Sequence, residues 1–339
     1  MKSNDEKLTA RSWFYSQPKQ NVPECSECDA LKVYRLGYTG QYIIETEIDS
    51  GLGGEPVEIN QITDIHFNYV AIADESDGEA MGTRSCRKWL REGESVKSAI
   101  NAMNVAEYAD QTVITGDTLD YLSKGTEMLT KRHIISRDPG VMIALGGHDL
   151  TKQMQTSLPN ELSLDERMAI LSEFWPHDMF YHAKDVGDKV ICVCLDNSRS
   201  CFLPCQPDRL DKEIKRARTE RKILLLFMHE PISTRDFKGK LPTLWYSPGA
   251  HREYDFCTED TVGFKPNDEA TKRMYSLITE NADVIKGIFC GHRHSMFYTE
   301  IIASYSDNEG IHQSVIPQLV APGNPYLDHA GRVVRIIVK

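Results

Sequence analysis

The stretch Val113-Ile114-Thr115-Gly116-Asp117-Thr118-Leu119-Asp120 decides the fold, because strand-forming apolar residues lead directly into two carboxylates. A β-strand delivers the residue that follows it to the carboxyl edge of its sheet, and α/β proteins place their functional sites at that edge. The stretch therefore predicts a strand that ends at a functional site containing Asp117 and Asp120.

Four other polar motifs stand in the same position, each after an apolar run. They are Asp64-Ile65-His66, Gly146-Gly147-His148-Asp149, His229-Glu230-Pro231 and Gly291-His292-Arg293-His294. The apolar runs before them cover residues 59–62, 141–145, 223–227 and 284–289. Five strands that end in His and Asp would bring these side chains to one rim of the protein.

Histidine and carboxylate side chains suit borderline divalent ions such as Mn, Fe and Zn. Two such ions held about 3.5–4 Å apart can clamp a phosphoryl group and generate hydroxide between them. This arrangement needs a carboxylate that bridges both ions, further ligands on each side, and a separate His near the leaving-group oxygen. The five motifs supply all of these residue types.

The composition narrows the class of protein and of partner. The chain has 339 residues and a formal net charge of -11, which argues against a nucleic-acid backbone as the main partner. A small phosphorylated substrate fits, because bound metal ions supply positive charge locally. The N-terminus does not read as a signal peptide, and no apolar run is long enough to span a bilayer. We therefore expect a soluble cytoplasmic protein without a membrane partner, whose oligomeric state the sequence does not indicate.

The remaining pattern predicts one large domain. Residues 1–30 are polar and contain two prolines, which predicts an extended N-terminal arm, and residues 31–339 form a single catalytic domain. Amphipathic helices are predicted over residues 95–108, 163–175, 208–219 and 268–281, and strands over 297–302, 316–320 and 333–338, with two or three more within 31–60. Ser163 and Glu166 have the spacing of a capping box. The alternation of strands and helices indicates an α/β protein.

The order of the five motifs over residues 64–294 resembles that of the calcineurin-like metallophosphoesterases. The resemblance implies a four-layer αββα sandwich with two mixed β-sheets and helices on both outer sides. It also implies a metal-dependent phosphoesterase that hydrolyses a small-molecule phosphodiester or phosphomonoester, with metal-bound hydroxide attacking phosphorus. Two divalent ions are implied, with Mn as the first choice and Fe or Zn as alternatives.

The resemblance also assigns a role to each matching residue. Asp64, His66 and His294 would hold the first ion, and His229 and His292 the second. Asp117 would bridge the two ions.

His148 matches the family's histidine that protonates the leaving group or steadies the transition state. Asp120 matches the carboxylate that orients this histidine. The Ser/Thr protein phosphatases extend the second motif to Gly-Asp-Tyr-Val-Asp-Arg-Gly. Here Tyr121 and Leu122 follow Asp120, so the phosphate-gripping Arg is missing and protein phosphatase activity is not expected.

One position departs from the family pattern. The third motif normally carries an Asn that binds the second ion, and this chain has Gly147 there. The second ion would keep three protein ligands from the pattern, completed by water, substrate or a nearby side chain. Gly147 is also open to interpretation as a turn residue with positive φ. The favoured interpretation is an altered but working site, and the alternative is a non-catalytic binding scaffold of the same fold.

The sequence does not identify the substrate. Substrate specificity is expected in the segments 69–94 and 232–265, and the second of these lies in a long segment that is either a lid or an ordinary surface loop. Asp196 and Asn197 end another predicted strand, and they either face the rim of the site or form a simple turn.

Overall fold

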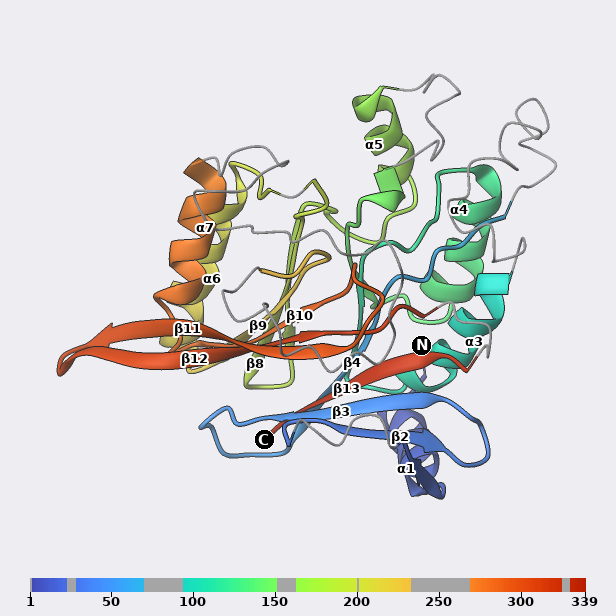
Figure 1. The fold of residues 1–339 in the computed structure, drawn as a ribbon, viewed down its shortest axis with the longest axis horizontal. Helices are drawn as coiled ribbons and strands as arrows, with labels where there is room; N and C mark the ends of the chain where they lie inside the picture. Colours follow the sequence, from blue (N-terminus) through green and yellow to red (C-terminus); the bar gives the residue numbers. More distant parts are fainter. Residues whose placement is uncertain are drawn as a thin grey trace.

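The computed structural model describes residues 2–22, 29–69, 94–150, 163–199, 201–232, 269–324 and 330–339. Within them lie two mixed β-sheets that pack face to face and carry helices on their outer sides (Figure 1). The first sheet has the strand order β1-β2-β3-β13-β4-β5-β6, and the second has the order β11-β12-β10-β9-β8-β7.

The first sheet contains both antiparallel and parallel strand pairs. Its strands are β1 (Lys19–Asn21), β2 (Lys32–Leu36), β3 (Tyr42–Ile48), β13 (Arg332–Val338), β4 (Val57–Ile62), β5 (Gln111–Thr115) and β6 (Met142–Ala144). The strands β4, β5 and β6 run parallel to one another, whereas β13 is antiparallel to β4. The carboxyl ends of β4, β5 and β6 therefore lie at one edge of the sheet.

The second sheet has a parallel centre and antiparallel edge strands. Its strands are β11 (Phe297–Asp307), β12 (Gly310–Val320), β10 (Ile285–Cys290), β9 (Ile223–Phe227), β8 (Val190–Leu195) and β7 (Tyr181–Val186). The strands β8, β9 and β10 run parallel, and β7 and β11 pair antiparallel with their neighbours. Every residue of β8 and β9 is buried, as expected for strands covered on both faces.

Three layers of apolar side chains hold the sheets and helices together. Alternate residues of one strand point to opposite faces, so Val113 of β5 packs between the two sheets while Ile114 packs under the helices. The helices are α1 (Asn4–Ser16), α3 (Glu94–Ala106), α4 (Lys124–Thr130), α5 (Leu164–Ser172), α6 (Gln206–Glu220) and α7 (Glu269–Thr279), and α4 continues as a π-helical turn over Lys131–Ile135. Figure 1 shows α6 and α7 side by side on one side of the molecule and α3 and α4 on the other. The predicted four-layer αββα sandwich with two mixed sheets is confirmed.

The four predicted helices are present with shifted ends, and α5 has the predicted capping box. Ser163 Oγ accepts a hydrogen bond from Glu166 N, and Ser163 N donates to Glu166 Oε2 at 2.7 Å. Leu210 and Ile214 of α6 are buried, as the periodicity predicts.

The prediction of an extended N-terminal arm is wrong for residues 4–16, which form α1. A capping box between Ser3 and Glu6 starts this helix, with Ser3 N donating to Glu6 Oε2 at 2.7 Å. Phe14 is buried in the core under the first sheet, and β1 pairs with β2. A local capping signal and one apolar anchor therefore outweigh the polar composition of the segment.

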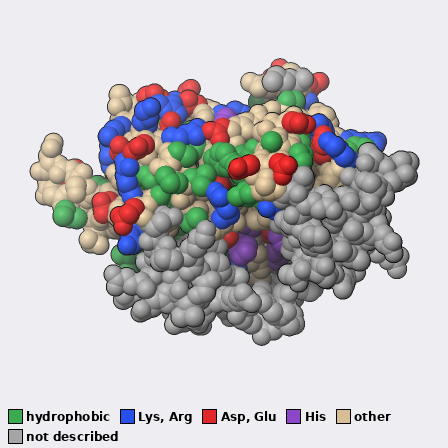
Figure 2. Space-filling view, turned by 90° about the horizontal axis from the view of Figure 1, so that it is seen from above, with side chains coloured by type: hydrophobic (Ala, Val, Ile, Leu, Met, Phe, Trp, Pro, Cys, Tyr) green, Lys and Arg blue, Asp and Glu red, His purple; other side chains and the backbone are tan. Residues whose placement is uncertain are grey.

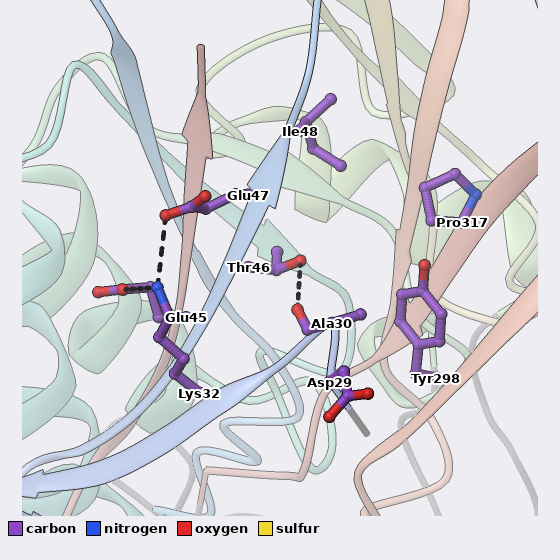
Figure 3. Close-up of a pocket in the computed structure, with 9 residues that line it drawn as sticks. All are labelled: Asp29, Ala30, Lys32, Glu45, Thr46, Glu47, Ile48, Tyr298 and Pro317. Atoms are coloured by element: carbon purple, nitrogen blue, oxygen red, sulfur yellow. Dashed lines mark hydrogen bonds and ion pairs between the residues drawn. The ribbon is translucent and has the colours of Figure 1, made fainter. Parts of the chain in front are cut away.

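A hollow of about 170 Å³ lies where β3 meets the hairpin of β11 and β12 (Figure 3). Its lining includes Lys32, Glu45 and Glu47, and Lys32 Nζ lies 3.4 Å from Glu47 Oε1. None of the five motifs contributes to this lining. No helix in the described parts of the chain is long and apolar enough to cross a membrane.

Candidate metal centre

The site is built by loops that follow parallel strands of both sheets and meet across them. The loop after β4 meets the loop after β10, because His292 N donates to Asp64 Oδ2 at 2.9 Å. The end of β5 meets the loop after β9, since His229 Nδ1 lies 2.8 Å from the Thr115 carbonyl oxygen. Figure 2 shows histidine side chains inside a hollow of the surface.

Asp64, His66, Asp117 and His294 form a first cluster of ligand atoms, all within 4.8 Å of one another. Asp64 Oδ1 lies 3.0 Å from His294 Nε2, and the two Nε2 atoms of His66 and His294 are 3.2 Å apart. Asp117 Oδ2 lies 3.6 Å from His66 Nε2. Three of these four residues are buried, and His294 is partly exposed.

Asp117, His229 and His292 form a second cluster with the same spacing. Asp117 Oδ2 lies 3.1 Å from His229 Nε2, and His229 Nε2 lies 3.3 Å from His292 Nδ1. The oxygen Oδ2 of Asp117 thus approaches both clusters. The other oxygen, Oδ1, accepts a hydrogen bond of 2.9 Å from the backbone N–H of His148.

Asp120 lies between two histidines. Its Oδ1 is 3.2 Å from Nδ1 of His66 and 3.2 Å from Nδ1 of His148. The His66 and His148 rings meet edge to face, with centroids 4.6 Å apart. The His148 side chain is 20% exposed, whereas His66 and Asp120 are fully buried, so His148 is the member of the group that reaches the surface. The sequence paired Asp120 with His148, and the contact with His66 is an additional finding.

The backbone at the site is left-handed at most of the predicted ligands. Among the described residues, six that are not glycine have positive φ, and five of them are Asp64, His66, Asp117, His292 and His294. This conformation is uncommon for residues other than glycine, and such strain clusters at functional sites. The fold therefore holds these side chains in place at a conformational cost.

The two glycines of the third motif differ in their surroundings. A Cβ on Gly146 would lie 2.2 Å from Asp117 N, so this close approach requires glycine. Among the described residues, a Cβ on Gly147 would meet the Ser198 carbonyl oxygen, at 3.3 Å, and the φ of Gly147 is not positive. The interpretation of Gly147 as a turn residue with positive φ is therefore wrong, since its backbone suits other residues.

The carboxylates of the clusters are held ionised by the histidines. Burial by itself raises the pKa of Asp64 and of Asp117, but the charge and hydrogen bonds of His294 and His229 outweigh it, and both pKa values lie well below the usual range. The pKa of Asp120 is lowered as well, since the bonds to His148 and His66 outweigh its burial.

Asp149, which the sequence left without a role, behaves differently. Burial and the charge of Asp117 raise the pKa of Asp149 to about 7. Its two oxygens accept the backbone N–H groups of Leu119 and Gly146, both at 2.8 Å. Asp149 thus fastens the loop after β5 to the loop after β6.

The two histidines of the second cluster titrate in opposite directions. Burial lowers the pKa of His229, but Asp117 more than compensates and raises it to about 10. Burial and the charge of His229 lower the pKa of His292 to about 3.

The donor set fits divalent cations. His229 Nδ1 has to donate to the Thr115 carbonyl, so a neutral ring turns the lone pair of Nε2 toward the Asp117 carboxylate 3.1 Å away. Two acceptors this close need a cation or a proton between them. Ligand atoms about 2.1 Å from a shared ion lie about 3.0–3.4 Å apart, and the shortest contacts in both clusters match this spacing.

The loop after β8 is a third contributor to the rim on the second sheet. Asn197 Nδ2 donates to the Glu230 carbonyl at 2.7 Å, and Glu230 N donates to Asn197 Oδ1 at 3.0 Å. Asn197 therefore anchors the residue after His229, while Asp196 Oδ1 accepts a hydrogen bond from Ser198 N at 2.9 Å, as in a strand-end turn. The expected specificity segments fall almost entirely on residues 70–93 and 233–268, outside the described residues.

No protein-family model matches the sequence, and neither does any curated protein. Similar solved structures include a purple acid phosphatase from yellow lupin (Lupinus luteus) seeds, 13% identical with a TM-score of 0.46 over 87% of this chain and 49% of that one. A dimetal phosphatase from Danio rerio is 11% identical with a TM-score of 0.41 over 83% of this chain and 92% of that one. A calcineurin-like phosphoesterase from Bacillus subtilis is 13% identical with a TM-score of 0.36, over 80% and 82%.

The chain thus spans about half the length of the lupin enzyme. The third of these structures is named as a calcineurin-like phosphoesterase, the family that the five motifs resemble.

Proposed function

We propose that this protein is a phosphoesterase that uses two divalent metal ions to hydrolyse a small phosphorylated molecule. The observation that carries the proposal is the position of Asp117 Oδ2, which approaches His66 Nε2 of one cluster and His229 Nε2 of the other. A carboxylate shared by two ligand clusters is the arrangement that a two-ion phosphoesterase requires.

In this proposal Asp64, His66 and His294 hold the first ion, and His229 and His292 hold the second. Asp117 touches both. Nitrogen and carboxylate ligands suit Mn, Fe and Zn, and Mn remains the first choice. When bound, the ions supply positive charge to the phosphoryl oxygens and lower the pKa of water.

The hydrolysis also needs a proton for the leaving alkoxide, and His148 is placed to supply it. Its Nδ1 lies beside Asp120 Oδ1 at 3.2 Å, so the proposal assigns the proton transfer to Nε2. Asp120 fixes the orientation of the imidazole and stabilises its protonated form.

The substrate class is a phosphodiester or phosphomonoester of a small molecule. Tyr121 and Leu122, which follow Asp120, are buried with exposures of 3% and 4%, so neither side chain is available to grip a phosphate. This supports the expectation that the protein is not a phosphoprotein phosphatase.

Hydrolysis of bis-p-nitrophenyl phosphate and p-nitrophenyl phosphate by the metal-free chain with added Mn tests the proposal. We expect turnover that depends on Mn and disappears in Asp117→Ala. A chain that binds two Mn ions but hydrolyses neither ester, with Mn, Fe or Zn, is instead the binding scaffold. The converging ligands and the strained backbone at five of them favour catalysis.

A further inference from the structure

The place where the family carries its Asn ligand is bordered in this chain by Ser198. The loop containing Gly147 follows β6 of the first sheet, and the loop containing Ser198 follows β8 of the second. They meet closely, since the Ser198 carbonyl oxygen lies 3.3 Å from the position of a Cβ on Gly147. Ser198 is therefore the residue nearest to where a side chain at position 147 would begin.

The loop that carries Ser198 is fixed from two sides. Ser198 N donates to Asp196 Oδ1 at 2.9 Å, and Asp196 is 2% exposed. Asn197, the residue between them, forms hydrogen bonds with both the N–H and the carbonyl of Glu230. Since Glu230 directly follows His229, these bonds tie the loop of Ser198 to a ligand of the second cluster.

The hydroxyl group of Ser198 is buried and finds no hydrogen-bond partner among the described residues. Ser198 as a whole is 6% exposed. A buried hydroxyl without a partner costs about 1–3 kcal/mol, so its presence beside a cluster of ligands needs an explanation. Ser98 of α3 also has a buried hydroxyl without a partner, but α3 contributes no residue to either cluster. Both hydroxyls are buried, so Ser198 differs from Ser98 by its position beside the loops of the two clusters.

We propose that the Ser198 hydroxyl is an oxygen ligand of the second metal ion, in the place that Gly147 leaves open. The inference rests on the proposed two-ion site. It gives the second ion Asp117, His229, His292 and Ser198 as protein ligands. Loss of the Asn at position 147 is thus offset by a side chain from the opposite sheet.

Mn titration of the metal-free chain by calorimetry tests this assignment, with Ser98→Ala as the matched control. Both variants remove one buried hydroxyl that has no partner. We expect Ser198→Ala to weaken the second Mn by at least about tenfold, the lower limit for losing even an outer contact of a ligand, and to leave the first within about twofold. Ser98→Ala leaves both affinities unchanged.

A second variant tests direct contact with the ion. Ser198→Cys replaces a hard oxygen by a thiolate, which prefers softer ions. Titration of Ser198→Cys with Cd should give the ultraviolet band of a cadmium–thiolate bond beyond that of the native chain, and Ser98→Cys should not. If Ser198 has only a structural role, a cysteine in its place should not produce this band.

The outcomes separate this inference from the proposed function. A native chain that binds fewer than two Mn ions contradicts the two-ion site. A native chain that binds two, together with unchanged Mn affinities in Ser198→Ala or no additional cadmium–thiolate band in Ser198→Cys, overturns the role of Ser198 alone. Thermal unfolding of the metal-free variants shows whether they fold. If Ser198→Ala does not fold, the cadmium band of Ser198→Cys decides.

Discussion

The two halves of the metal centre are built by the same kind of loop but carry different sets of ligand side chains. The first cluster has Asp64 as a carboxylate of its own, two histidines and the shared Asp117. The second has two histidines and Asp117, and no unshared carboxylate joins it among the described residues. Gly147 adds no side chain near the second cluster, although its backbone would accept another residue.

Both halves nevertheless fix the tautomer of one of their histidines. Asp120 lies beside His66 Nδ1, and the Thr115 carbonyl accepts from His229 Nδ1. In each case Nε2 is left facing Asp117. The asymmetry is therefore confined to the ligand set, because each half has a hydrogen-bond partner that orients one of its histidines.

The largest effect is expected from the residue that the two halves share. Asp117→Ala removes the one carboxylate oxygen that approaches both clusters in the described part of the chain, so it should abolish hydrolysis and the tight binding of both ions. Elemental analysis and a phosphodiester assay measure the two effects. Asp208→Ala, whose side chain is 76% exposed on α6, serves as the control and should change neither. Two bound ions with near-normal turnover in Asp117→Ala would show that the site is wrongly assigned.

His148→Ala should separate chemistry from metal binding. His148 belongs to neither half, so its loss should slow hydrolysis by roughly 10²–10⁴-fold, the usual range for general acid–base help, while metal content stays normal. The loss should shrink for p-nitrophenol esters, whose leaving group needs little protonation. Equal losses for good and poor leaving groups would contradict the role. His312→Ala, on the hairpin of β11 and β12, is the matched control.

Asp120→Ala should affect the first half and His148 together. Asp120 Oδ1 lies 3.2 Å from both His66 Nδ1 and His148 Nδ1. Loss of such a supporting carboxylate costs about 10- to 100-fold in metal affinity, and we expect this loss at the first ion and not at the second. Asp120→Asn keeps an acceptor oxygen and should lose less. If Mn titration of Asp120→Ala finds the affinity for the first ion unchanged, the supporting role of Asp120 is limited to His148.

Much of the fold could be predicted from the sequence because its strands are short apolar runs that end in polar motifs. β9 is buried throughout, and so are β4 and β5, and each leads into a predicted ligand. By contrast α4 was missed, since its seven residues are too few to show a helical period. β7 was missed because its central residues are polar and only partly buried.

The candidate site was predictable to the extent that its residues follow strands. All six predicted ligands and the pair of His148 and Asp120 are brought together. The approach of Ser198 to Gly147 could not be foreseen, because it depends on how two loops from different sheets meet. The same is true of the contact between Asp120 and His66, which lie 54 positions apart.

The smallest expected effect comes from placing at position 147 the Asn that the family pattern has there. In the native chain, Mn titration should give two unequal affinities, because only the first half has a carboxylate of its own. Gly147→Asn should tighten the weaker one by less than about tenfold, or about 1.4 kcal/mol. The new Cβ would lie 3.3 Å from the Ser198 carbonyl oxygen, so the loop after β8 has to move by a few tenths of an ångström. That shift offsets part of the gain from the additional ligand.

Gly53→Asn is a control for the added amide, because a Cβ there meets no atom within 4 Å and the residue lies in a turn before β4. If the native chain binds two Mn ions equally tightly, the loss of Asn has been fully compensated and Gly147 says nothing about activity. If Gly147→Asn also tightens the second ion in a Ser198→Ala background, and by more than in the native chain, then the two side chains serve the same position. An equal gain in both backgrounds would mean that the amide and the hydroxyl act independently, because residues that replace one another at a shared ligand position are not additive.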